Sequence, residues 1–96
     1  MTKPDNPNAP PPKRGALLDY DGLRAATAAA IKDARVTQAE TAELVAERVP
    51  ERNRAPTVSA VSNAVRQSGA AVATLQTDIL RALTGATLTG PLFRVD

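Results

Sequence analysis

The sequence predicts a mostly α-helical fold, a small four-helix domain followed by a short C-terminal β-hairpin or dimerising strand. Three observations predict it. Apolar residues recur at helical spacing in four segments, prolines and glycines separate those segments, and after Gly85 the pattern changes to short extended runs. A chain of 96 residues has room for one small domain.

The chain divides into three parts. Residues 1–14 contain five prolines and almost no apolar side chain, which predicts a disordered proline-rich tail. Residues 15–85 form the helical domain, and residues 86–96 form a C-terminal β-arm. The tail lacks the apolar core of a secretory signal, and no apolar run approaches membrane-spanning length. We therefore expect a soluble, cytoplasmic protein.

The first helix is predicted from about Asp21 to Ala34, with Asp19 or Asp21 as its N-cap and Leu17 and Leu18 packing back onto its start. One face of this helix carries residues at helical spacing: Leu23, Thr27, Ala30, Ile31 and Ala34.

The second helix begins with the clearest local signal in the chain. Thr37 followed by Glu40 fits a capping box, in which each side chain bonds the backbone N–H of the other residue. Pro50 ends the helix, since proline disfavours helical geometry in the residue before it. The face predicted to be apolar consists of Ala39, Ala42, Val45, Ala46 and Val49.

A polar connection over residues 50–56 leads to the last two helices. The third begins near Pro56 and extends to about Gln67, with Gly69 as its stop. The fourth runs from about residue 74 to residue 83, carries Leu75, Ile79 and Leu83 on one side, and ends at Gly85.

The C-terminal segment reads as two short extended runs, 86–89 and 92–95, around a Gly90–Pro91 turn. An isolated hairpin of this size is marginal in water, so it must pack on the helices or pair with a second chain. We favour pairing with a second chain for at least one strand. A thin core of Ala, Val and Leu independently favours a homodimer.

The third helix has two different sides. Val58, Val61 and Val65, with Ala64 at the border, are predicted to face the core. The other side consists of Ser59, Ala60, Asn63, Arg66 and Gln67. Asn and Gln bond adenine, Arg bonds guanine, Ser bonds either, and Ala60 would touch a thymine methyl. Two short helices, the second with a free polar face, are typical of a helix-turn-helix that reads the DNA major groove.

The distribution of charge favours the same interpretation. The net charge is only +2, but no acidic residue occurs between Glu51 and Asp78, a window that holds three arginines. An ordinary solvated amphipathic helix is the alternative. The predicted DNA-contacting residues, with Thr57 and Gln38 placed for phosphates, are Gln38, Arg52, Arg54, Thr57, Ser59, Ser62, Asn63, Arg66 and Gln67.

The chain has no cysteine and no histidine, which removes thiolate metal sites, the usual general base near neutral pH and the commonest metal ligand. Asp19, Asp21 and Asp78 are separated along the chain and are better explained as caps or surface charges. We therefore predict no catalytic residue, metal, cofactor or small-molecule substrate, and a protein that is not an enzyme.

Part of the chain resembles the helix-turn-helix of phage Cro and repressor proteins. The resemblance covers about residues 37–69: Thr37-Gln38 with Ala42 and Val45, then the run Ser59–Val65, then Gly69. In that family a Gln opens the second helix, an Ala packs where the helices cross, and a Ser-Ala-Ile/Val run lies in the third helix. The resemblance implies base or phosphate contacts for Gln38, Ser59, Ser62, Asn63 and Arg66, and core positions for Ala42, Val45, Val61 and Ala64.

The sequence departs from that family in the connection, where a longer segment with Arg52 and Arg54 replaces a tight turn. These arginines would approach the DNA backbone. The C-terminal strands are similar to the arm through which some Cro proteins dimerise. They could equally form the wing of a winged helix, which would place Arg94 or the Thr87–Gly90 turn near the minor groove.

The leading functional expectation is a small phage- or prophage-type transcriptional regulator or repressor. It would bind double-stranded DNA as a homodimer on a palindromic operator, in the cytoplasm with the nucleoid (the host cytoplasm if phage-encoded). The alternative is a protein-interaction module, an antitoxin or helical adaptor, using the acidic second helix. Its surface would comprise Glu40, Glu43, Glu47 and Glu51.

Overall fold

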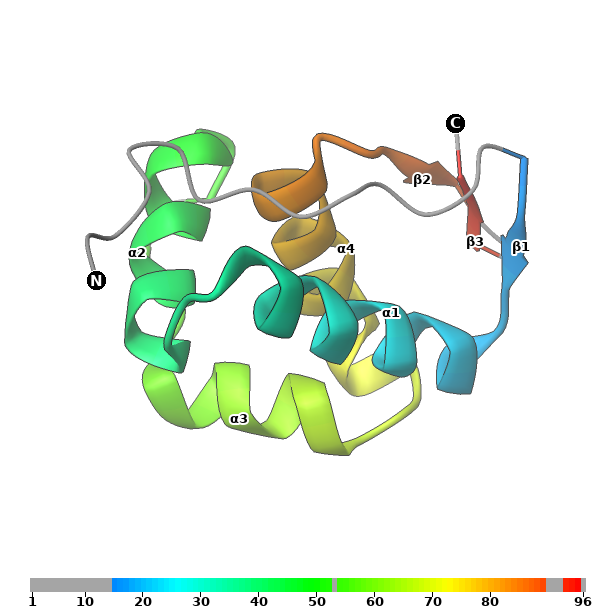
Figure 1. Cartoon of the computed structure of the whole chain (residues 1–96), viewed down its shortest axis with the longest axis horizontal. Helices are drawn as coiled ribbons and strands as arrows, with labels where there is room; N and C mark the ends of the chain where they lie inside the picture. Colours follow the sequence, from blue (N-terminus) through cyan, green and yellow to red (C-terminus); the bar gives the residue numbers. More distant parts are fainter. Residues whose placement is uncertain (1–14, 53, 90–92, 96) are drawn as a thin grey trace.

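The computed structural model describes residues 15–52, 54–89 and 93–95, and shows the predicted mostly helical fold with a short antiparallel C-terminal hairpin (Figure 1). The predicted disordered tail and the Gly90–Pro91 turn lie outside the described residues. The helices are α1 (Tyr20–Ala34), α2 (Gln38–Arg48), α3 (Val58–Arg66) and α4 (Ala70–Thr84), and the strands are β1 (Leu17–Leu18), β2 (Leu88–Thr89) and β3 (Phe93–Val95).

The first two helices begin at the predicted caps. The Asp19 carboxylate accepts a hydrogen bond from the Gly22 N–H at 2.6 Å. At α2, the Thr37 hydroxyl accepts from the Glu40 N–H at 3.0 Å, and the Glu40 carboxylate accepts from the Thr37 N–H at 3.0 Å. Both halves of the predicted capping box are therefore present.

The core lies where α1, α2 and α3 pack around α4. Every residue predicted on the inner face of α1 is buried, including Thr27, whose hydroxyl donates to the Leu23 carbonyl at 2.8 Å. This bond satisfies the only polar group of that side chain, so Thr27 can occupy an apolar interior. The largest apolar side chains that are fully buried are Leu23, Val45, Val49, Val61, Ile79, Leu80 and Leu83.

The predicted inner face of α2 is wrong at two positions. Ala42, Val45 and Val49 are buried as expected, but Ala39 and Ala46 are exposed. Thr41 is fully buried instead, and its hydroxyl donates to the Thr37 carbonyl at 2.8 Å. The inner face of α2 therefore includes Thr41 and leaves out Ala39 and Ala46. Thr41 can pack there as an apolar residue does, because its hydroxyl is hydrogen-bonded.

The boundary between α3 and α4 also differs from the prediction. Gly69, expected to stop α3, is the N-cap of α4 and has φ +127°. α4 accordingly begins at Ala70, one turn earlier than predicted, while Gly85 ends it in the left-handed region as expected. Thr57, one residue after Pro56, caps α3 by accepting from the Ala60 N–H at 3.0 Å.

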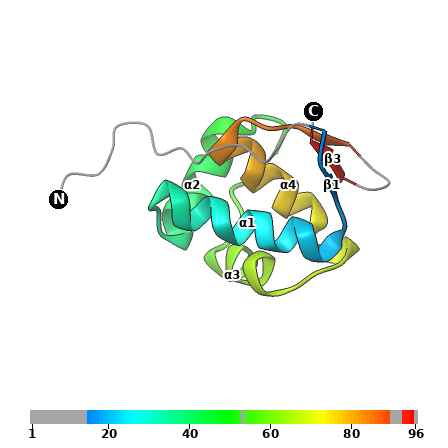
Figure 2. The ribbon, with the colours of Figure 1, turned by 45° about the vertical axis from the view of Figure 1, so that its right-hand side comes forward.

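The short strands form one three-stranded antiparallel sheet in the order β1-β3-β2. Leu17 and Leu18, expected only to pack on α1, form a strand that pairs with β3. β3 therefore has a neighbour from its own chain on each side, and does not need the second chain that we expected for at least one strand. The two aromatic rings of the chain, Tyr20 and Phe93, join the sheet to the start of α1 with centroids 5.8 Å apart. Figure 2 shows the sheet at the opposite end of the molecule from α2.

The corrected face of α2 predicts opposite outcomes for two matched substitutions. Ala46→Gln should change the free energy of unfolding by less than about 0.5 kcal/mol, since Ala46 is exposed. Ala42→Gln should destabilise the protein by roughly 2–4 kcal/mol, because it forces a larger polar side chain into a packed position. Urea denaturation of both variants measures this. Equal effects would contradict the assigned face.

Candidate nucleic-acid interface

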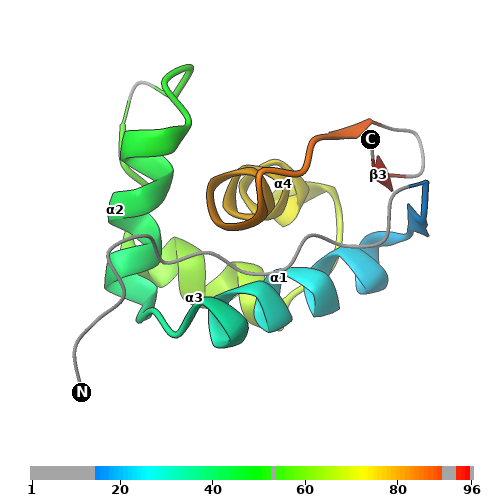
Figure 3. The same ribbon diagram turned by 45° about the horizontal axis from the view of Figure 1, so that its top comes forward.

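Helix α3 is held by one side and leaves the other side free. Val61 and Ala64 are fully buried against the other helices. The residues on the remaining surface of α3 and at its two caps are exposed or half-buried: Thr57, Ser59, Ser62, Asn63, Arg66 and Gln67. The start of α3 lies beside the first turn of α2 (Figure 3), which carries Gln38 in a half-buried position.

Val58 corrects the predicted inner face of α3. Its side chain is 48% exposed, whereas Val65 is half-buried. At 3.6 residues per turn, Val58 lies roughly 90° around the helix from the midpoint between Val61 and Ala64. It therefore stands at the edge of the free surface, next to Ser62 one turn later, rather than in the core.

Two side chains on the free surface of α3 bond each other. The Arg66 guanidinium donates through Nη2 to Asn63 Oδ1 at 3.1 Å and through Nε to the Ser62 carbonyl at 3.3 Å. Asn63 Oδ1 therefore already uses one of its two lone pairs, and most of the hydrogen-bonding capacity left to this pair consists of N–H donors. Such a pair suits acceptors, namely phosphate oxygens or the O6 and N7 atoms of guanine, more than the adenine contact expected for Asn63.

The C-terminal end of α3 is fixed by a residue of α4. Gln76 is fully buried, and its Nε2 donates to the Ala64 carbonyl at 2.7 Å and to the Gln67 carbonyl at 2.9 Å. These bonds satisfy carbonyls at the end of α3, which explains why α3 ends without a glycine. Gln76 was not predicted from the sequence, although its spacing to Ile79, Leu80 and Leu83 places it on the buried face of α4.

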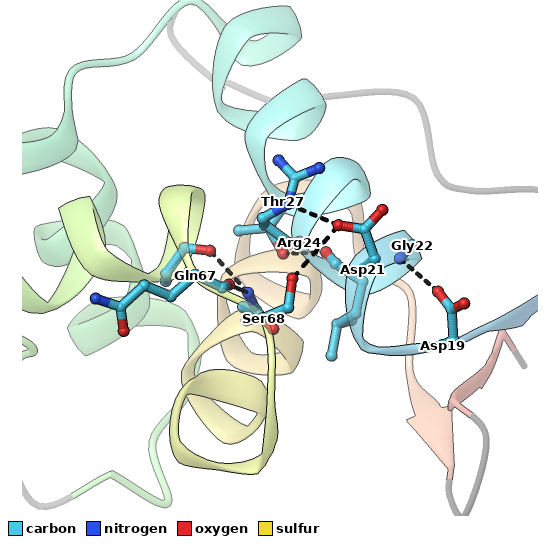
Figure 4. A network of polar contacts seen from close by, with 10 residues as sticks. Asp19, Asp21, Gly22, Arg24, Thr27, Gln67 and Ser68 are labelled. Carbon is cyan, nitrogen blue, oxygen red and sulfur yellow. Dashed lines mark hydrogen bonds and ion pairs between the residues drawn. The ribbon is translucent and has the colours of Figure 1, made fainter.

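A second contact joins the end of α3 to the start of α1 (Figure 4). The Ser68 hydroxyl donates to the Asp21 carboxylate at 3.4 Å, and Arg24 pairs with the same carboxylate at 3.1 Å. The negative charge of Asp21, close to this end of α3, is therefore balanced by Arg24. The side chain of Gln67 points away from this network.

Arg52 and Arg54, which follow α2, differ in their surroundings. Arg52 donates to the Asp78 carboxylate of α4 at 2.6 Å, and both side chains are largely covered. Arg54 is exposed. α2 is about 16 Å long, and the segment with Arg52 leaves it at the end away from α3. The structure thus brings together the predicted contacts of α3 and leaves Arg52 apart from them.

Two of the four glutamates of the alternative, protein-binding surface have internal partners. Glu40 forms the capping box, and Glu51 accepts two hydrogen bonds from Arg81 at 2.9 and 3.0 Å. These bonds from Arg81 lower the pKa of Glu51. Glu43 and Glu47 are exposed on α2.

Over residues 15–52, 54–89 and 93–95, no three His, Cys, Asp or Glu side chains come close enough together to hold a metal ion. Within the same residues, none of the helices has the length and apolarity to cross a membrane.

Comparison of the chain with protein-family models, with curated proteins and with solved structures gave no match. The fold and the free surface of α3 therefore define the protein at the level of a structural class. It is a small four-helix domain in which one short helix presents hydrogen-bonding side chains and an arginine.

The bonds from Gln76 predict how substitutions there change stability. Gln76→Leu should lower the free energy of unfolding by roughly 1–3 kcal/mol, because it leaves the Ala64 carbonyl without a partner. Gln76→Glu should lower the free energy of unfolding further, since a carboxylate would face two carbonyl oxygens. Urea denaturation measures both, with the exposed Gln67→Leu as the matched control. Unchanged stability in both Gln76 variants would show that α3 is not held this way.

Proposed function

We propose that this protein binds double-stranded DNA sequence-specifically and acts as a small transcriptional regulator, with α3 in the major groove. The observation that carries the proposal is the division of α3. One side is buried through Val61 and Ala64, and the other bears hydroxyl, amide and guanidinium groups. α3 contains no carboxylate, so nothing on the helix itself repels phosphate.

The geometry of α3 supports a specific role for each part of its surface. A single helix fits the major groove, and its first turns reach the base edges. Ser59 and Ser62 would bond bases there, and the Asn63–Arg66 pair would bond guanine or a phosphate. Thr57 and Gln38, at the starts of α3 and α2, would contact phosphates.

A homodimer on a palindromic operator, with half-sites about one helical turn apart, is part of the proposal. β3 is enclosed by its own chain, so a second copy would meet the edge of β1 or β2. Exposed Leu17 and Tyr20 lie at the β1 end and support self-association there. The proposed location is the cytoplasm, with the nucleoid.

The protein-interaction module is the weaker alternative. Of its four glutamates, Glu40 belongs to the capping box and Glu51 is paired with Arg81. Its acidic surface therefore consists of Glu43 and Glu47. Exposed glutamates on a helix are ordinarily solvated and need no partner.

Selection from a random duplex pool at two salt concentrations tests the proposal. We expect enrichment of a palindrome, with affinity that falls steeply as salt rises, because bound phosphates release counterions. Arg66→Ala should then weaken binding to the selected duplex by about 1–3 kcal/mol in a gel-shift titration.

The matched control is Arg81→Ala, which removes the same unit of charge from an arginine paired with Glu51. It should leave affinity for the selected duplex nearly unchanged, since Arg81 belongs to α4 and not to α3, and the loss of an exposed ion pair should not unfold the protein. Salt-sensitive retention without enrichment would mean a non-specific DNA binder. Absence of retention at low salt would overturn DNA binding and favour a protein partner.

A further inference from the structure

We infer that Val58 is a specificity-determining residue that contacts the 5-methyl group of one thymine in each half-site. The inference rests on the proposed function and deepens it, since it names a base that α3 reads. The starting observation is the exposure of an apolar side chain on a helix surface that is otherwise polar.

The exposure of Val58 is unusual within the described residues. Three large apolar side chains are exposed there: Leu17, Tyr20 and Val58. Leu17 belongs to strand β1 of the sheet, and Tyr20, at the start of α1, contacts Phe93 of β3. Val58 lies apart from these two residues, on the first turn of α3 and directly after the cap Thr57.

The position of Val58 matches the part of a recognition helix that reaches base edges. Residues of the first helical turn enter the groove most deeply. Ser62, four residues later, lies on the same side of α3, and Ser59 is its exposed neighbour. Val58 therefore belongs to the surface whose hydroxyl groups would contact bases.

The chemistry of valine selects one partner in the groove. Valine has no donor or acceptor, and the thymine methyl is the apolar group that the major groove presents. A β-branched side chain keeps essentially one χ1 rotamer in a helix, so the two methyl groups of Val58 are held in place before binding. Ala60, expected from the sequence to make this contact, is half-buried and lies on the other flank of α3.

The test replaces each thymine of the selected duplex, one at a time, by deoxyuridine. This change deletes the methyl group and leaves base pairing unchanged. For the wild-type protein we expect about a fourfold loss of affinity at one position of each half-site, the effect of one buried methyl-sized group. For Val58→Ala the same replacement should have no effect at that position, because the contact has already been removed.

Ser59→Ala is the matched control, since it changes the neighbouring exposed residue and should keep the uridine effect at the Val58 position. Val58 is exposed, and alanine favours helix, so Val58→Ala should fold. Circular dichroism checks this before binding is measured.

Two results would overturn the inference alone: no thymine whose methyl group matters, or equal uridine effects for wild type and Val58→Ala. In either case an enriched duplex would still support the proposed function. A selection that enriches no sequence overturns both.

Discussion

The placement of α3 depends on the buried amide of Gln76. α3 has nine residues, fewer than an isolated helix needs for stability in water. Its inner side supplies only Val61 and Ala64 to the fully buried core. The two bonds from Gln76 fix its C-terminal end to α4, and Thr57 fixes its start. These contacts set which side of α3 faces solvent.

The same arrangement leaves the surface proposed to bind DNA outside the side-chain ion pairs that join the segment after α2 to α4. Groups near the ends of α2 and α4 are used for internal ion pairs, Arg52 with Asp78 and Arg81 with Glu51. The outward side chain of Arg66, in contrast, bonds groups of α3 itself, namely Asn63 Oδ1 and the Ser62 carbonyl. A helix surface whose contacts are local can exchange them for a ligand without loosening the fold, which is what a recognition helix requires.

Local signals in the sequence were enough to predict most of the helices. The caps Asp19 and Thr37, the stop at Gly85 and the apolar spacing of α1 depend on residues within a few positions of one another. Contacts between distant segments could not be predicted in this way. β1 forms only because β3, more than seventy residues later, pairs with it.

The candidate surface could be predicted only in part, because some of its features depend on contacts between distant segments. The exposed polar residues of α3 follow from its helical period. The exposure of Val58 depends on how far α3 is rotated against α4. Gly69 is not needed to end α3, because Gln76 bonds the Gln67 carbonyl there. Arg52 was predicted to contact DNA because its partner in the fold, Asp78, is twenty-six positions away in the sequence. One sequence carries no local signal for such a pairing.

DNA binding through the free surface of α3 can be tested by chemical-shift mapping. A ¹⁵N-labelled protein would be titrated with a short duplex at low salt. If α3 binds DNA in this way, the shifts should concentrate at residues 57–67 and at the start of α2, including the side-chain amides of Asn63 and Gln67. Shifts confined to the Glu43 and Glu47 side of α2, or no shifts at all, would contradict it.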